Sequence, residues 1–420
     1  MSITSSFYSA LSGLDAFSVA MQVIGDNVAN VHTAGFKSST AHFEDILGQS
    51  LSGVTGSSQT GAGTKVSTVD LDFYQGSFAT TNVSTDIAIN GRGFFVVGNP
   101  ASDEKFYTRS GHFTLDNEGY YVNNQGFQVQ GYLYDDSGQN LIETLSDIQI
   151  NQNSMIEPRV TGAVDISLNL DASATVKTWD PDDAAGTTNF STALNIFDTL
   201  GQSHQIQLYF VKTDSQTWDW HAMVDGSDID GGTPGELTEY GTGTVVFDTS
   251  GQLTTAMPVA FRTGTLVFAN GLSPTDATVD FTSSSQFGSE SAVQTILQDG
   301  YAPGMVSGVG IDEEGNIIAT YTNGTVKNIA RLALADFTNL NGLVRKGATL
   351  YQGTTSSGQP IYNKPGVGGM GTVSSSMLEE SNVDMAAEFI RMIVIQRGYQ
   401  ANSKVISTTD EMLAQLMSIR

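Results

Sequence analysis

Residues 1–31 read MSITSSFYSALSGLDAFSVAMQVIGDNVANV, and the apolar side chains of this stretch decide how the whole chain is interpreted. They recur at alternating intervals of four and three residues, which is typical of a helix with one apolar seam. The pattern predicts a helix from about Thr4 to Asn30, roughly 40 Å long. Gly35 is a suitable left-handed stop beyond it. The seam consists of Ile3, Phe7, Ala10, Leu14, Phe17, Met21, Ile24 and Val28.

The other end of the chain shows the same period. From Met377 to Arg420, 44 residues follow a helical pattern, which is enough for roughly 60 Å of helix. Two apolar lines lie side by side here, so this helix has a face wide enough for more than one neighbour. The first line is Met385, Phe389, Met392, Tyr399, Ile406, Leu413 and Met417, and the second is Ala386, Ile390, Ile393 and Val394.

The two ends are each other's most suitable partners, because no other helical pattern of useful length is present. Two helices alone bury too little apolar surface to be stable, so their remaining faces are expected to pack on helices of other copies. The alternative is a single closed domain whose termini pack on their own β core. The residues predicted to form the polymerisation surface are Ile3, Phe7, Leu14, Met21, Ile24, Val28, Met385, Phe389, Ile390, Met392, Ile393, Tyr399, Ile406 and Leu413.

Between the ends the apolar period is two, as in β-strands. A short motif, an apolar residue followed by Asp, two free positions and Gly, recurs at 115–119, 134–138, 197–201, 247–251 and 311–315. The Asp can accept backbone N–H groups and the Gly can take a positive φ, so the motif predicts hairpin turns. A calcium site is the alternative, but the ligand spacing of an EF-hand is missing.

The predicted fold class is mainly β with terminal α-helices. The paired helices form a coiled-coil inner domain and carry two successive β-sandwich or barrel-like domains inserted between them. The predicted domains are 1–35 with 374–420 (terminal helical domain), 36–69 with 366–373 (linker or extended arm), 70–147 with 289–365 (middle β domain) and 148–288 (outer β domain).

Two stretches are poor in bulky side chains and are expected to be flexible. Residues 48–65 contain 12 Gly, Ser or Thr in 18 positions, which predicts a linker or a loosely held arm that orders against a neighbouring molecule. Residues 364–375 read KPGVGGMGTVSS and predict a hinge. Its glycines are Gly366, Gly368, Gly369 and Gly371.

Composition excludes several classes of function. The net charge is −26, and residues 151–289 alone carry 17 acidic and 4 basic side chains, so a nucleic-acid footprint is absent. There is no cysteine, and the N-terminus lacks the basic and apolar regions of a secretory signal. No run of 18 apolar residues is present, so no membrane insertion is expected.

No catalytic or cofactor site is expected. The five histidines show no metal-ligand spacing, and GAGTK at 61–65 lacks the spacing of a phosphate loop. Trp179, Trp218 and Trp220 could line a carbohydrate site, but such residues more often form the core of a β-sandwich. The sequence therefore predicts a protein that is not an enzyme and that holds neither metal nor cofactor.

The amino-acid sequences of the two ends resemble those of the bacterial flagellar axial proteins, a family of rod, hook and hook-associated proteins. DNVANVHTAGFK (26–37) and LEESNVDMAAEFIRMIVIQRGYQANSKVISTTDEMLAQL (378–416) carry this resemblance. Gly398 departs from this resemblance, since many relatives have Ala there. A glycine in place of alanine costs about 1 kcal/mol of helix propensity. The matching motif residues are Asn27, Asn30, Gly35, Phe36, Glu379, Ser381, Asn382, Val383, Asp384, Glu388, Gln396, Arg397, Tyr399, Gln400, Ala401 and Asn402.

The chain length, NGRGFFVV (90–97), QDGYAPG (298–304) and the block STALNIFDTLGQSHQIQLYFVK (191–212) are most similar to the hook members. The resemblance implies an extracellular structural subunit of the flagellum, exported unfolded by the type III apparatus without a cleaved signal. It implies self-assembly into a curved hollow tube that acts as a universal joint between rod and filament. Its expected partners are the distal rod, hook cap and hook–filament junction proteins. The alternatives are a distal-rod or hook-associated protein and, from another class, a cell-surface adhesin.

Overall fold

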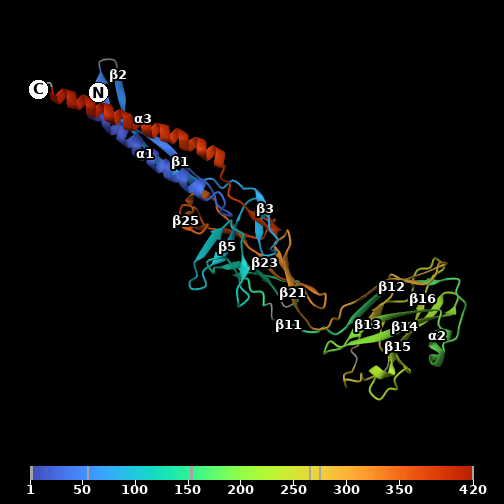
Figure 1. Ribbon diagram of the computed structural model, residues 1–420. Coiled ribbons are helices and arrows are strands. Elements are labelled where there is room, and N and C mark those ends of the chain that lie inside the picture. The colour runs from blue at the N-terminus through green and yellow to red at the C-terminus, as the bar shows by residue number, and fades with distance from the viewer. Residues whose placement is uncertain are drawn as a thin grey trace. The chain divides into compact units, whose positions relative to one another are not determined.

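The chain is mainly β, with one long helix at each end (Figure 1). Two compact units are present. The first comprises Met1–Gln152, Gly308–Thr320 and Val326–Arg420, and the second comprises Asn153–Ser307 and Tyr321–Thr325. The computed structural model describes residues 3–53, 56–135, 137–151, 155–263, 266–273 and 276–418, and within its helices and strands the side chains of 3–5, 48–60, 416 and 418 are also left undescribed.

Helix α1 (Ile3–Ala29) begins and ends within one residue of the prediction. Helix α3 (Met385–Ser418) is shorter than predicted, because it begins only at Met385. The Asp384 carboxylate accepts the N–H groups of Ala386 and Ala387 at 2.9 and 3.2 Å, which caps the first turn. The residues before it are extended, as strands β28 (Thr372–Ser375) and β29 (Met377–Glu379). The helical assignment of 377–384 was therefore wrong.

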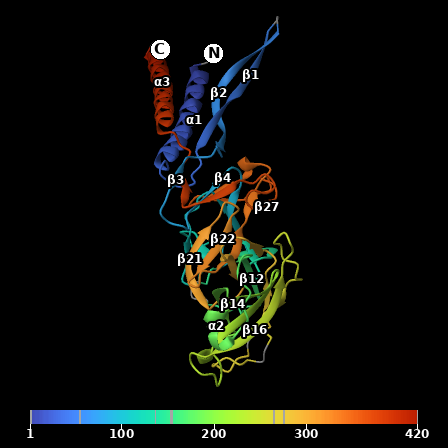
Figure 2. The ribbon, with the colours of Figure 1, turned by 90° about the vertical axis from the view of Figure 1, so that its right-hand side faces the viewer.

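The stretch predicted as a linker is a long antiparallel hairpin of β1 (Ser39–Gly53) and β2 (Gly56–Leu71), interrupted by bulges. It lies along α1 (Figure 2). The Thr64 N–H donates to Ser12 Oγ at 3.2 Å, and the ring of Phe43 packs edge-on against Phe17 at 5.8 Å. A Cβ on Gly63 would lie 2.0 Å from Ser12 Oγ, so the hairpin approaches α1 closely here. The linker interpretation was wrong for the described backbone, which is paired as strands.

The rest of the first unit is an antiparallel β structure, which we call the middle β structure and whose strands are given below. Its main sheet runs in the order β22-β23-β9-β5-β6-β26-β25, with β10 on β9 and β24 between β5 and β27. Two short ribbons, β4 with β28 and β3 with β29, join it to the chain ends. The core strand FFVVG of β5 is buried throughout.

The strands of this part have the following bounds: β3 (Phe78–Thr80), β4 (Ile87–Asn90), β5 (Phe94–Gly98), β6 (Lys105–Thr108), β7 (Thr114–Leu115), β8 (Tyr121–Val122), β9 (Gln128–Tyr134), β10 (Leu141–Asp147), β22 (Asn316–Tyr321), β23 (Val326–Leu332), β24 (Leu334–Asp336), β25 (Val344–Gly347), β26 (Leu350–Gln352) and β27 (Ile361–Asn363). A 3₁₀ turn, η3, covers Leu340–Gly342.

The second unit holds two sheets around one core. An antiparallel sheet in the order β13-β14-β15-β16 faces a sheet in the order β17-β18-β12-β19, to which β20 adds by pairing with β12. Trp218 and Trp220 are fully buried in this core, as the sandwich interpretation predicted. Residues 289–307, which the sequence placed in the middle domain, lie in this unit because β20 is part of its sheet.

The elements of this unit are β11 (Met155–Ile156), β12 (Ala163–Asp171), η1 (Pro181–Asp183), α2 (Ala184–Thr187), β13 (Phe190–Phe197), β14 (Ser203–Asp214), β15 (Thr217–Asp225), η2 (Gly226–Asp228), β16 (Leu237–Val246), β17 (Val259–Ala260), β18 (Thr278–Asp280), β19 (Ser285–Phe287) and β20 (Ala292–Gln298). Strand β21 (Gly304–Ile311) begins in this unit, where it pairs with β11.

All five Asp-x-x-Gly motifs are turns, as predicted. In each, the glycine N–H donates to the carbonyl of the Asp three residues earlier at 2.8–3.1 Å. Each of these glycines has a φ between 70° and 84°, which side chains with a Cβ rarely adopt. The Asp carboxylates accept further backbone N–H groups, as Asp248 does from Ser250 and Gln252.

Candidate assembly surface and its junction

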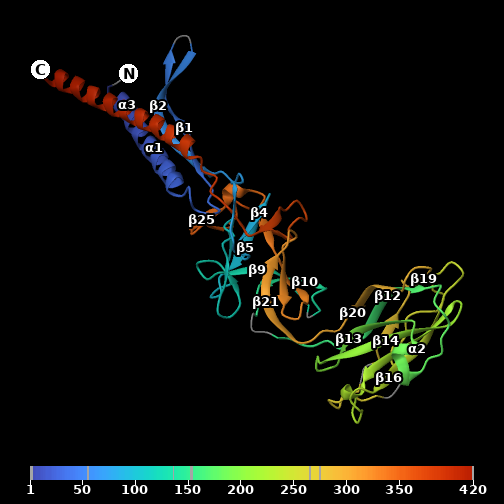
Figure 3. The ribbon, with the colours of Figure 1, turned by 45° about the vertical axis from the view of Figure 1, so that its right-hand side comes forward.

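Helices α1 and α3 pack side by side and antiparallel, with both chain ends at the same end of the pair (Figure 3). The closest approach occurs at two glycines. A Cβ on Gly13 would lie 2.3 Å from Asn402 Nδ2, and a Cβ on Gly398 would lie 2.8 Å from the Phe17 ring. Neither helix could approach so closely with a larger residue at these positions, so the two glycines set the register of the pair.

The buried stripe of α1 consists mostly of small residues and shares only Ala10 and Ile24 with the predicted seam. The other described seam residues are half-buried at its margins, namely Phe7, Leu14, Phe17, Met21 and Val28. The side chain of Ile3 lies outside the described ones. Large side chains would hold α1 and α3 further apart, so small side chains form the contact between them. The buried stripe is Ala10, Gly13, Ala16, Ala20, Ile24 and Asn27.

On α3 the predicted seam also faces away from α1, apart from Met392 and Ile406, which are half-buried. The helix instead turns Glu388, Ile395, Gly398, Asn402 and Thr409 inward, and all five are buried or half-buried. The exposed members of the predicted set are Met385, Phe389, Ile390, Ile393, Tyr399 and Leu413. Four of these residues, Glu388, Ile395, Asn402 and Thr409, recur every seven positions, a signal that the search for large apolar residues did not use.

Four neighbouring residues in the first half of α3, which we call the α3 apolar patch, are Phe389, Ile390, Ile393 and Val394. Their exposed fractions are 48, 64, 51 and 62%. Ser6–Ala29 of α1 is likewise apolar and long enough to cross a membrane by composition, but only 28% of its apolar window is buried. Both helices therefore retain apolar faces that this single chain does not cover.

A buried polar cluster, which we call the junction, ties the base of the helix pair to the middle β structure. The Glu379 carboxylate lies 2.6 Å from Lys37 Nζ and 3.4 Å from Arg109 Nη1, and it accepts the Gly76 N–H at 2.9 Å. Lys37 also donates to the Tyr74 carbonyl at 2.7 Å. The side chains of Lys37 and Glu379 are completely buried.

Burial dominates the electrostatics of this cluster. Desolvation lowers the pKa of Lys37, although the Glu379 carboxylate acts in the opposite direction. Desolvation likewise lowers the pKa of Arg109, again opposed by Glu379. The single carboxylate therefore stabilises two buried cations that would otherwise be strongly unfavourable.

Several family-motif residues build this region. Asn27 accepts the Ser39 N–H at 2.9 Å and donates to the Ser39 carbonyl at 2.8 Å. Asn382 accepts the Ser38 N–H at 2.7 Å and donates to the Asp72 carbonyl at 2.7 Å. These two amides therefore hold the start of the hairpin between the ends of both helices.

The other motif residues have varied surroundings. Gly35 has a φ of 71°, and its N–H donates to the Glu379 carbonyl at 2.7 Å. The Arg345 guanidinium lies over the Phe36 ring, and the Asn30 side chain donates to Asp26. Ser381 Oγ accepts the Val383 N–H at 3.4 Å. Gln396 and Arg397 are exposed on α3.

The predicted hinge is held by contacts in the structure. Gly366, Gly368 and Gly369 have positive φ values of 64–83° in consecutive turns. Gly371 packs so closely that a Cβ would lie 2.4 Å from the Asn90 carbonyl, and Met370 beside it is buried. Bending at this segment remains a prediction.

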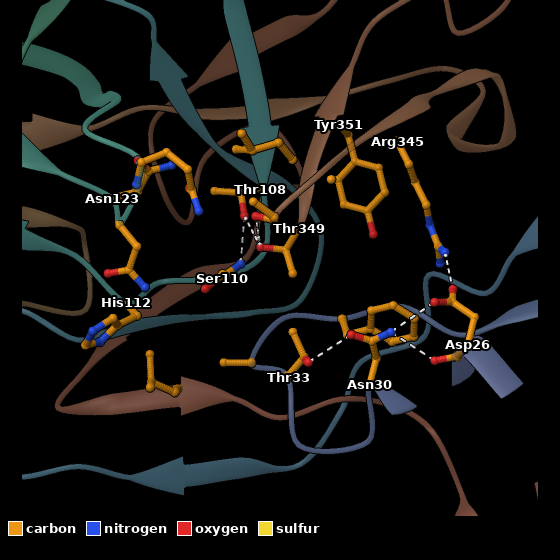
Figure 4. A pocket seen from close by; sticks show the side chains of 18 residues that line it. Asp26, Asn30, Thr33, Thr108, Ser110, His112, Asn123, Arg345, Thr349 and Tyr351 are labelled. Atoms are coloured by element: carbon orange, nitrogen blue, oxygen red, sulfur yellow. Dashed lines mark hydrogen bonds and ion pairs between the residues drawn. The ribbon is translucent and has the colours of Figure 1, made fainter. Parts of the chain in front are cut away.

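A cavity of about 660 Å³ lies beside the junction, between the turn after α1 and the β25–β26 hairpin (Figure 4). Asp26 and Arg345 pair at 3.2 Å on one side of it, and Thr349 lies on another. Thr349 has a φ of 59°, a strained value for a β-branched residue. Burial raises the pKa of Tyr351, also in the wall, to about 12.

Family models cover most of the chain in four segments. Residues 7–37 match "Flagella basal body rod protein", and 88–171 match "Flagellar hook protein FlgE/F/G D1 domain". Residues 169–301 match "Flagellar basal body protein FlaE D2 domain", and 374–419 match "Flagellar basal body rod FlgEFG protein C-terminal". The matched ends are the two helices and the arm that leads into α3.

Comparison with individual proteins gives matches over the full length. The chain is 32% identical to the flagellar hook protein FlgE of Escherichia coli K12, covering 99% of this chain and 100% of the relative. It is also 32% identical to the FlgE of Treponema pallidum, covering 99% of each. The crystal structure of Helicobacter pylori flagellar hook protein FlgE2 has a similar fold, with a TM-score of 0.53 at 18% identity, covering 72% of this chain and all of that one.

Proposed function

The chain belongs to the family of flagellar hook proteins, and on that premise we propose how its ends build the hook. It is a structural subunit of the hook and not an enzyme. The full-length matches to hook proteins favour the hook over the rod, hook-associated and adhesin alternatives that the sequence left open. The family implies a polymer of copies of the same chain within the basal body.

We propose that copies assemble by covering each other's terminal helices. The main support for this proposal is the α3 apolar patch, in which four large residues are about half or more exposed. Complete burial of one such side chain contributes roughly 1.5–3 kcal/mol, so a neighbouring helix on this patch would supply a large part of the assembly free energy. The small-residue contact between α1 and α3 keeps these large residues on the outside.

In this proposal the helices form an inner domain, coiled-coil in character, around a central channel. The predicted middle and outer β domains lie outside it. The tube is curved and acts as a universal joint between rod and filament. The distal rod, hook cap and hook–filament junction proteins are its neighbours, and the subunit reaches the cell exterior through the type III apparatus without a cleaved signal. The absence of cysteine is compatible with folding after export.

Replacing Ile390 by Asp tests this function. We expect the variant to stay soluble with both β structures intact, while the critical concentration for tube formation rises at least about a hundredfold, or roughly 2.8 kcal/mol. Thr408→Asp is the matched control, because it adds the same charge on the same line of α3 about five turns further along. Electron microscopy and sedimentation of the purified proteins measure the result. Normal tubes from Ile390→Asp would exclude the patch as an assembly surface.

A further inference from the structure

The junction connects segments that are far apart in the sequence. Glu379 lies 342 positions after Lys37 and 270 positions after Arg109, yet its carboxylate contacts both. Lys37 follows α1, Glu379 precedes α3, and Arg109 follows β6 in the middle β structure. One carboxylate therefore joins the bases of both terminal helices to the domain that they carry.

Hydrogen bonds to backbone carbonyl groups also hold the junction together. The Gly35 N–H donates to the Glu379 carbonyl at 2.7 Å, and the Glu380 N–H donates to the Ser77 carbonyl at 2.8 Å. The Arg345 guanidinium donates to the Lys37 carbonyl. These contacts hold the backbone segments that bring the three charged side chains together.

Charge makes this arrangement sensitive to single changes. Two cations and one carboxylate are buried together, and the Lys37 ammonium completes its contacts with the Tyr74 carbonyl. Loss of the carboxylate charge would leave the Lys37 ammonium uncompensated inside the protein, and Arg109 would keep its weaker attraction to Asp336. A buried pair that loses one partner is far more unfavourable than a surface pair that does. Loss of the Glu379 charge therefore weakens the contacts with both Lys37 and Arg109.

We propose that Glu379 is the positioning residue of the assembled subunit: through Lys37 and Arg109 it holds the helix pair on the middle β structure as one rigid body. The shifts that a bending tube requires then occur between neighbouring copies and not at this junction. The inference rests on the proposed function, since it concerns the subunit inside the tube. It also assigns a role to Lys37 and Arg109, which sequence reasoning did not select.

The absence of cysteine allows a direct test, because introduced thiols are unique. Gln400→Cys on α3 and Lys346→Cys on β25 are both exposed and accept spin labels. Labelled chains diluted in unlabelled ones assemble into tubes, and pulsed electron resonance measures the distribution of distances between the two labels within a chain. Glu379→Gln removes the charge, and Glu380→Gln is the matched control at the exposed neighbour.

We expect one narrow distribution in the parent and in Glu380→Gln, and a distribution at least about twice as wide in Glu379→Gln. Arg109→Gln, which keeps the shorter Lys37 contact, should give an intermediate width and decides the question if Glu379→Gln forms no tubes. Equal widths in all variants, or a broad distribution in the parent, would overturn the proposal. Failure of the proposed function would appear separately, as normal assembly of Ile390→Asp.

Discussion

The terminal helix pair and the β core of the second unit bury opposite kinds of side chain. In the second unit the largest residues are the most buried, with Trp218 and Trp220 at 0 and 1% exposure. In the helix pair the small residues Ala16 and Ala20 are buried, while Ile390 and Val394 are more than 60% exposed. The β core is complete within one chain, whereas the helix pair leaves its largest apolar residues for other copies.

The largest effect is expected when a large side chain is removed from the β core of the second unit. Trp220→Ala removes a ring that packs against Phe261 and Phe281 at 6.1 and 5.9 Å. Such a truncation typically costs about 3–5 kcal/mol. We expect the second unit to melt on the order of 10 °C lower, as measured by calorimetry. Tube formation below that temperature should be unaffected, and its loss would show that the two regions are not independent.

A smaller effect is expected from filling the contact between the helices. Gly398→Leu places a side chain where even a Cβ would lie 2.8 Å from the Phe17 ring. Overpacking of this kind costs about 1–3 kcal/mol, so the variant should lose helix content by circular dichroism and assemble poorly.

Gly25→Leu is the matched control for this change, because nothing lies within 4 Å of a Cβ at Gly25. It should gain helix propensity, by somewhat under 1 kcal/mol. Equal helix content in the two variants would mean that the glycine notch does not set the distance between α1 and α3.

These substitutions bear on how far the sequence predicts the fold. The bounds of α1 and the five Asp-x-x-Gly turns follow from local rules, since a seam and a glycine with positive φ act over a few residues. The side of each helix that is buried does not follow, because it depends on which surface approaches. The heptad pattern found the large residues, and the structure places them around a contact made by Gly13 and Gly398.

The remaining differences arise from long-range pairing. Residues 377–384 have a helix-compatible pattern, but the pairing of β29 with β3 holds Met377–Glu379 extended, next to the pairing of β28 with β4. The Gly- and Ser-rich stretch at 48–65 becomes a hairpin because α1 lies along it. Lys37 could have been noticed as the one basic residue among the first 47, but nothing local connects it to Glu379.

Low pH provides a test within the β core of the second unit, where two turn aspartates can be compared. Asp198 and Asp248 hold the same kind of turn, but Asp198 is buried and also contacts Asn270 and His204. Burial acts to raise the pKa of Asp198, and the hydrogen bonds from Gln202, Asn270 and His204 outweigh it, so the pKa is lowered overall. A carboxyl with a lowered folded-state pKa contributes stability above its unfolded pKa of about 3.9, and this is lost as pH falls through the folded value.

Asp198→Asn should therefore destabilise the second unit by about 1 kcal/mol at neutral pH and flatten the dependence of its stability below about pH 4. Asp248→Asn, at an exposed turn, should give a much smaller change at neutral pH. Denaturant unfolding at several pH values followed by tryptophan fluorescence measures both. If the two variants behave alike at neutral pH, the buried contacts of Asp198 add nothing to the turn itself.

The methionines of α3 offer the most informative test of the uncovered helix faces. Met385 and Met412 are 41 and 48% exposed and Met392 is half-buried, so only Met392 fits the interpretation of methionine as core filler within one chain. An unbranched, polarizable side chain can repack against a shifted neighbour with little loss of packing energy.

Replacing all three methionines by Leu conserves volume and should change the stability of the free chain by less than about 1.5 kcal/mol per site. The tube, however, should become stiffer or straighter, because Leu fits fewer positions of the neighbouring helix. Persistence length and curvature from electron micrographs measure this, with Met155→Leu on the exposed β11 as control. Unchanged curvature and bending in the triple variant would mean that these faces bind neighbouring copies without sliding along them.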